Sequence, residues 1–175
     1  MPVTNNRQSL DWQARFNRSV IAILGPTLAE QGFQVSLDQV TEDVEPDSYG
    51  PFYVGEVGFT RPLSDGWFAH LVVQSTLHGT GSPDAFYVDI LRLKQASPPD
   101  WDSGPATGGP AGTVIRRISR PAGGGQGWRY GSPDDLRAHL SELRDHLIEP
   151  QAGPVPGTAY LTWIQDLPGA PRSGT

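Results

Sequence analysis

Cysteine is absent from the 175-residue chain, and methionine and lysine occur once each. Without thiols the protein has no disulfide framework, no thiolate-bound zinc, no iron–sulfur cluster and no cysteine nucleophile. No apolar run approaches the ~18 residues of a membrane-spanning helix. Residues 1–13 lack the apolar centre of a signal peptide, which predicts a cytoplasmic protein. The length fits one globular domain with an apolar core.

The charge is negative and unevenly distributed. A formal net charge of −6 at pH 7 argues against general binding to nucleic acid or to anionic membranes. Between Ser19 and Thr60 there are seven acids and no base, whereas the stretch from Arg116 to Arg129 carries four arginines and no acid. The preference for arginine over lysine, with 21 glycines and 17 prolines, is typical of proteins from GC-rich bacterial genomes.

Helical periodicity is strong near the start of the chain. Apolar residues recur there at steps of three and four: Trp12, Phe16, Val20, Ile23, Leu24 and Leu28. We expect Ser9 to cap this helix and Gly25–Pro26 to kink or split it. Gly32 is the expected left-handed stop, after which Phe33 can fold back on the last turn.

A second helix is predicted near the end of the chain. Ser132 is its expected N-cap, with Pro133 in the first helical position and Asp134 and Asp135 in the first turn. Pro150 ends the pattern. The apolar stripe of this helix consists of Leu136, Leu140, Leu143 and Leu147.

Strand-like segments fill the middle of the chain. They are 33–37, 52–60, 67–77, 85–94 and 113–119. The pair 67–77 and 85–94 predicts an antiparallel hairpin, the second strand of which is apolar on both faces. In the segment 52–60, Gly55 and Gly58 are candidate bulge positions.

The order helix, strands, helix predicts a single α+β domain. We expect an antiparallel sheet of about five strands, with the N-terminal and C-terminal helices packed on it. The segments 98–112 and 121–127 are rich in glycine and proline, and they are predicted to be flexible loops. The segment 168–175 is predicted to be a disordered tail.

Candidate catalytic residues are few. The chain has no G-x-S-x-G motif and no conventional triad order. His70, Glu56 and Asp89 lie on strand-like segments, and in a cleft on the open face of the sheet they would supply an acid and a base. The sequence leaves the pairing of His70 with Asp89 open, and a hydrogen-bonded structural histidine is the simpler interpretation.

Metal binding is not predicted, and no cofactor is implied. Four polar residues follow one face of the second helix, namely Asp135, His139, Glu142 and His146. Imidazole and carboxylate groups at such spacing can bind a divalent ion. The two histidines are about 10 Å apart along the helix axis, however, so we expect a solvated helix face, with a metal site only as the alternative.

Acidic residues concentrate in the segment 38–47. They are Asp38, Glu42, Asp43, Glu45 and Asp47. Such a cluster accelerates encounter with a basic surface, which makes it the candidate binding surface for a protein partner or for a second copy of the chain.

The order of elements resembles a group of small uncharacterised bacterial domains of unknown function. The similarity rests on the amphipathic first helix ending at Gly32-Phe33, on Val73-Gln-Ser75, on Phe86-Tyr-Val-Asp-Ile90 and on the helix start Ser132-Pro-Asp-Asp135. It implies an α+β fold and assigns no catalytic residue. The long segment 98–112 departs from the pattern.

Two functions follow as expectations. The first is a non-enzymatic binding or accessory protein of an immunity-like or regulatory kind, which acts through protein–protein contact. The alternative is a small hydrolase or ligand-binding enzyme with a polar cleft on the sheet. A deep pocket that gathers His70, Glu56 and Asp89 would favour the enzyme.

Overall fold

The computed structural model describes residues 6–43, 52–63, 66–78, 85–94, 114–118 and 127–149. The helices in these ranges are α1 (Asn6–Glu30) and α2 (Pro133–Ile148). The strands are β1 (Gln34–Asp43), β2 (Phe52–Pro62), β3 (Phe68–His78), β4 (Ala85–Leu93), β5 (Val114–Ile118) and β6 (Trp128–Arg129). The predicted segments 98–112 and 168–175, most of 121–127, and the acids Glu45 and Asp47 lie outside the described residues.

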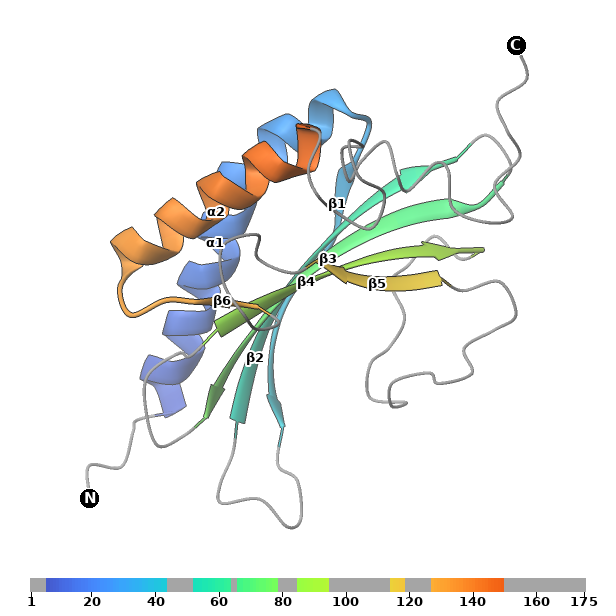
Figure 1. Cartoon of the computed structure of the whole chain (residues 1–175). Coiled ribbons are helices and arrows are strands. Elements are labelled where there is room, and N and C mark those ends of the chain that lie inside the picture. The colour runs from blue at the N-terminus through green and yellow to red at the C-terminus, as the bar shows by residue number, and fades with distance from the viewer. Residues whose placement is uncertain are drawn as a thin grey trace.

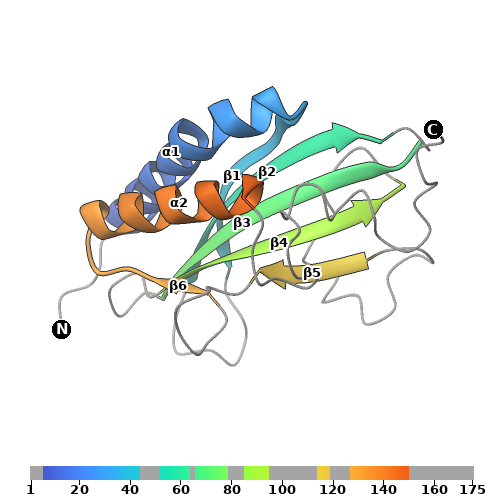
Figure 2. The same cartoon turned by 45° about the horizontal axis from the view of Figure 1, so that its top comes forward.

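The strands form one antiparallel sheet in the order β1-β2-β3-β4-β5. The two-residue β6 also pairs with β4, through Ala85 opposite Arg129 and Phe86 opposite Trp128. Both helices lie over the same face of the sheet, side by side (Figures 1 and 2). The fold is the single α+β domain that the sequence predicts.

The main core lies between the helices and the sheet. From α1 it contains Phe16, Val20, Leu24 and Leu28, and from α2 it contains all four leucines of the predicted stripe. A smaller apolar cluster of Val72, Leu91 and Leu93 is buried on the opposite face of the sheet. The strand β4 is therefore buried on both faces, as its sequence predicts, and only Tyr87 in it is partly exposed.

The C-terminus of α1 has the geometry that Gly32 predicts. Gly32 has φ +84°, and its N–H donates to the Ala29 carbonyl at 3.0 Å while the Phe33 N–H donates to the Leu28 carbonyl at 2.9 Å. These two bonds form a Schellman motif. Arg61 of β2 completes this end of the helix, because its guanidinium donates to the Gln31 carbonyl at 2.9 Å and lies 4.7 Å from the centre of the Phe33 ring. Burial lowers the pKa of Arg61.

The other end of α1 differs from the prediction, and of the predicted kink or split at Gly25–Pro26 the split does not occur. The helix begins at Asn6, so Ser9 is a buried residue near its start and not the N-cap. Pro26 lies inside the helix, which continues through Gly25–Pro26 without a split. The α2 start is as predicted, since the Ser132 hydroxyl accepts from the Asp135 N–H at 3.1 Å.

The strand β1 also differs from the prediction. The alternation of Phe33, Val35 and Leu37 predicts one apolar face, but the pairing of β1 with β2 shifts between Val35 and Leu37. The bulge puts Val35 opposite Phe59 on the helix side and Leu37 opposite Gly58 on the other side. Val35 is 46% exposed although it lies on the helix side.

Gly55 has a packing role and does not form a bulge. The pairing of β2 with β1 and β3 is continuous through this residue. A Cβ atom on Gly55 would lie 2.8 Å from Gln13 Oε1 and 2.9 Å from Asn17 Oδ1. The missing side chain therefore lets α1 approach the sheet closely.

In the described part of the chain, neither helix is both long and apolar enough to cross a membrane.

Candidate functional site

The three candidate catalytic residues of the sheet share its outer face but do not converge. His70 pairs with Leu91, so Asp89 is two residues further along β4, in a diagonal position about 7–8 Å away. Glu56 pairs with Gln74, four residues along β3 from His70. All three side chains are buried, with exposures of 0% for His70, 3% for Glu56 and 7% for Asp89.

His70 takes part in a hydrogen-bonded row across three strands. Its Nδ1 lies 2.8 Å from Thr60 Oγ1, which lies 2.6 Å from Ser36 Oγ on β1. Further along the sheet, Gln74 Nε2 donates to Glu56 Oε2 at 3.4 Å. These contacts fit the structural interpretation of His70, because a buried imidazole bonded to a threonine is held in place and is not presented to a substrate.

The polar residues of α2 form a continuous ladder. His139 lies between two carboxylates. Its Nε2 is 3.4 Å from Asp135 Oδ1, and its Nδ1 is 3.7 Å from Glu142 Oε2. His146 Nε2 lies 3.7 Å from the other oxygen of Glu142. The side chains of both histidines are largely covered, with exposures of 11% for His139 and 16% for His146. The prediction of a solvated face is therefore wrong for this pair, whereas the side chain of Asp135 is 47% exposed.

The geometry of this ladder matches paired side chains better than a metal centre. Within the ranges that the structure describes, no group of three or more His, Asp or Glu side chains is arranged to hold an ion.

We expect a chelator to leave the melting temperature of the protein unchanged, since the contacts within the ladder need no metal. Differential scanning calorimetry with and without EDTA measures this. A melting temperature that falls with EDTA and recovers with zinc would contradict the prediction.

The described acids of the segment 38–47 lie on an edge strand. β1 pairs with β2 alone among the described strands, so its second edge faces outward. Asp38 and Glu42 are both exposed. Tyr53 is buried beside Glu42, and its hydroxyl donates to the Glu42 carboxylate at 3.4 Å. Burial raises the pKa of Tyr53, and the charge of Glu42 and this hydrogen bond raise it further.

Asp38 has a second, structural role. The side-chain amide of Asn17 on α1 donates to Asp38 Oδ1 and to the Gln39 carbonyl, both at 2.9 Å. One turn earlier, Gln13 donates to the Tyr53 carbonyl at 3.0 Å. These two buried amides fasten α1 to β1 and β2. Asp38 therefore orients the edge strand, while Glu42 is exposed and can also contact a partner.

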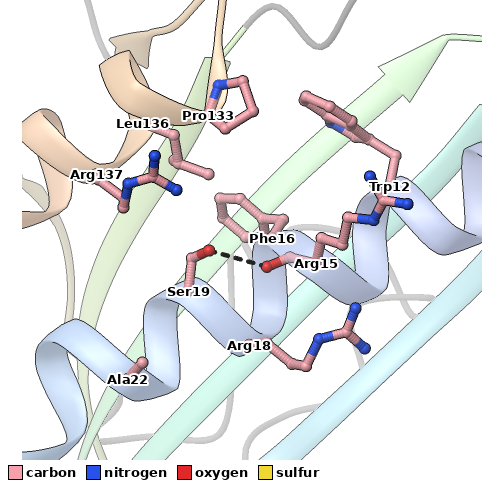
Figure 3. A pocket seen from close by; sticks show the side chains of 9 residues that line it. All are labelled: Trp12, Arg15, Phe16, Arg18, Ser19, Ala22, Pro133, Leu136 and Arg137. Atoms are coloured by element: carbon pink, nitrogen blue, oxygen red, sulfur yellow. Dashed lines mark hydrogen bonds between the residues drawn. The ribbon is translucent and has the colours of Figure 1, made fainter.

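A groove between the helices was not predicted. It has a volume of about 420 Å³ and lies where the start of α2 crosses α1 (Figure 3). Its lining consists of Trp12, Arg15, Phe16, Arg18, Ser19, Ala22, Pro133, Leu136 and Arg137. The sequence assigned Trp12, Phe16 and Leu136 to apolar stripes. That Arg15 and Arg137 share a cavity depends on how the helices pack, which no local pattern encodes.

Comparison with models of known families, with curated proteins and with solved structures finds no match to this chain.

Proposed function

We propose that the protein is a non-catalytic bacterial binding or accessory protein, which acts in the cytoplasm through contact with another protein. Its docking surface is the acidic edge, defined here as the strand β1 with its exposed acids. The partner is a basic, extended segment that adds to this edge. A regulatory or immunity-like role would follow from such a contact.

The observation that carries the proposal is the exposure of β1. Most of its side chains from Gln34 to Glu42 are exposed, and those of Leu37 and Val40 are partly so. The outer backbone groups of such a strand can pair with an added strand. Edge strands are usually blunted by charged side chains, proline or a bulge. β1 has acidic side chains and a bulge near its start but no proline or lysine, and its pairing with β2 is regular from Leu37 to Asp43. Its acids repel a second copy and attract a basic segment.

The buried positions of His70, Glu56 and Asp89 give the hydrolase alternative less support. A substrate would have to reach three groups that are at least 93% covered and are spread over separate rows of the sheet.

Photo-crosslinking from the acidic edge tests the proposal in the native host. A photoreactive residue at Gln39 or Thr41, both exposed on β1, is expected to capture a basic segment of another protein. The control places the same group at Ala138, which is exposed on α2. Capture of a second copy of the chain, or equal capture from both positions, would contradict the proposal.

Neutralising the acidic edge should slow association with the captured segment. The double variant Glu42→Gln/Asp43→Asn removes two charges, and the amide oxygen introduced by Glu42→Gln can still accept the hydrogen bond from the Tyr53 hydroxyl. We expect the association rate at low salt to fall by roughly tenfold and its salt dependence to flatten, since steering by charge is screened. Stopped-flow kinetics across a salt series measures both.

The matched control is Asp11→Asn/Glu149→Gln. It removes two charges from exposed positions, one on α1 and one at the end of α2, and leaves β1 intact. Equal slowing by both double variants would mean that only the net charge matters, and the acidic edge would not be the docking surface.

A further inference from the structure

The groove between α1 and α2 combines an apolar floor with cationic walls. Phe16 and Leu136 are 1% and 4% exposed, and in Figure 3 the Phe16 ring lies between α1 and the first turn of α2. Three arginines line the same space, two from α1 and one from α2. No lining residue is acidic, although the chain as a whole has a net charge of −6.

Two of these guanidinium groups have no anionic partner among the described residues. Arg137 pairs with Asp134. In the part of the chain that the structure describes, no ion pair involves Arg15 or Arg18, both of which are exposed. The Arg15 guanidinium lies beside Trp12, and that of Arg137 approaches from the opposite wall (Figure 3). Of these two walls, that of Arg15 carries a guanidinium without an anionic partner among the described residues, whereas Arg137 shares its charge with Asp134.

The donors that the groove presents to a ligand are its guanidinium groups. The indole Nε1 of Trp12 is buried, so it is not open to the groove. The Ser19 hydroxyl already donates to the Arg15 carbonyl at 3.0 Å. The lining thus offers N–H donors above an apolar surface, and guanidinium groups bind carboxylates and phosphates in a planar, two-bonded geometry.

We propose that this groove binds a small amphipathic organic anion. An aromatic or branched aliphatic group would lie against Phe16, Leu136 and Trp12, and its carboxylate or phosphate would lie between Arg15 and Arg137. The volume of about 420 Å³ falls in the usual range of small-molecule sites, roughly 300–1,000 Å³. The site is separate from the acidic edge on β1, and neither proposal depends on the other.

Binding of 1-naphthoate tests this site directly. It presents an aromatic body and one carboxylate, and 1-naphthalenemethanol is its uncharged counterpart. We expect saturable binding of 1-naphthoate by isothermal titration calorimetry, with an affinity about tenfold higher than that of the alcohol, because a charge-assisted hydrogen bond is lost with the carboxylate. Arg15→Gln and Arg137→Gln should each lower the affinity for 1-naphthoate by about tenfold for the same reason.

The control variant is Arg144→Gln, which removes an arginine of α2 that does not line the groove. It should bind 1-naphthoate as the unchanged protein does. Arg15 and Arg137 are exposed, so both variants should fold, and thermal melts check this. The proposal is overturned if 1-naphthoate does not saturate the protein at millimolar concentrations. It is equally overturned if the alcohol binds as tightly, or if neither groove variant weakens binding more than Arg144→Gln.

Discussion

Replacing Trp128 by alanine is expected to lower the free energy of unfolding by about 3–5 kcal/mol, the usual cost of emptying a large buried aromatic site. Trp128 is fully buried, and its ring stacks on Phe86 at 5.3 Å between centroids with an angle of 3° between planes. β6 is only two residues long. The Trp128 side chain is therefore the large buried contact between this strand and β4, beside the backbone pairing of the two strands.

The variant Trp128→Phe separates stacking from cavity formation. A phenyl ring keeps the stack on Phe86 and removes the indole Nε1, which is buried without a hydrogen-bond partner. Because an unsatisfied donor is itself costly, we expect a smaller loss than for alanine. Urea unfolding monitored by circular dichroism measures both variants.

The neighbouring Arg129 is exposed, and Arg129→Ala should change stability by less than about 0.5 kcal/mol. Similar losses for Trp128→Ala and Arg129→Ala would contradict the packing of β6.

Local signals in the sequence predicted most of the fold. Gly32 ends α1 through the two backbone bonds of the Schellman motif, Ser132 caps α2 through its hydroxyl, and both ends are found where expected. The double-sided apolar pattern of β4 correctly predicted a central strand. These features depend on a few neighbouring residues, which is why the sequence alone reveals them.

Features that depend on distant contacts were mispredicted or missed. No local pattern marks the bulge at Ser36, which puts Val35 and Leu37 on opposite faces of the sheet. The sequence offers Gly55 as a candidate bulge position. Its packing role cannot be predicted locally, because it depends on Gln13 and Asn17 of α1 lying over it.

The candidate sites show the same division. The acids of β1 could be named from the sequence, but the bond from Asn17 that gives Asp38 a structural role could not. The sequence correctly assigns His70, Glu56 and Asp89 to strands. Which residues lie opposite them depends on how the strands are aligned, and the loop between β3 and β4 does not determine that alignment. The groove needs residues from both helices, which lie at opposite ends of the described chain, and so it requires the packed structure.

Leu140→Ala should cost about 2–5 kcal/mol of stability. Leu140 lies in the middle of the α2 stripe and is fully buried in the cluster shared with α1 and the sheet. Alanine has the highest helix propensity, so the substitution does not weaken α2 itself, and the loss measures packing alone. Contacts between α2 and α1 would loosen first, which should also open the groove that contains Leu136.

Ile148→Ala is the matched control, because Ile148 belongs to the same helix but is 45% exposed. Chemical denaturation of both variants gives the two free energies. A loss for Leu140→Ala no larger than that for Ile148→Ala would show that α2 does not pack on the core through its leucine stripe, and the geometry of the groove would then have to be abandoned as well.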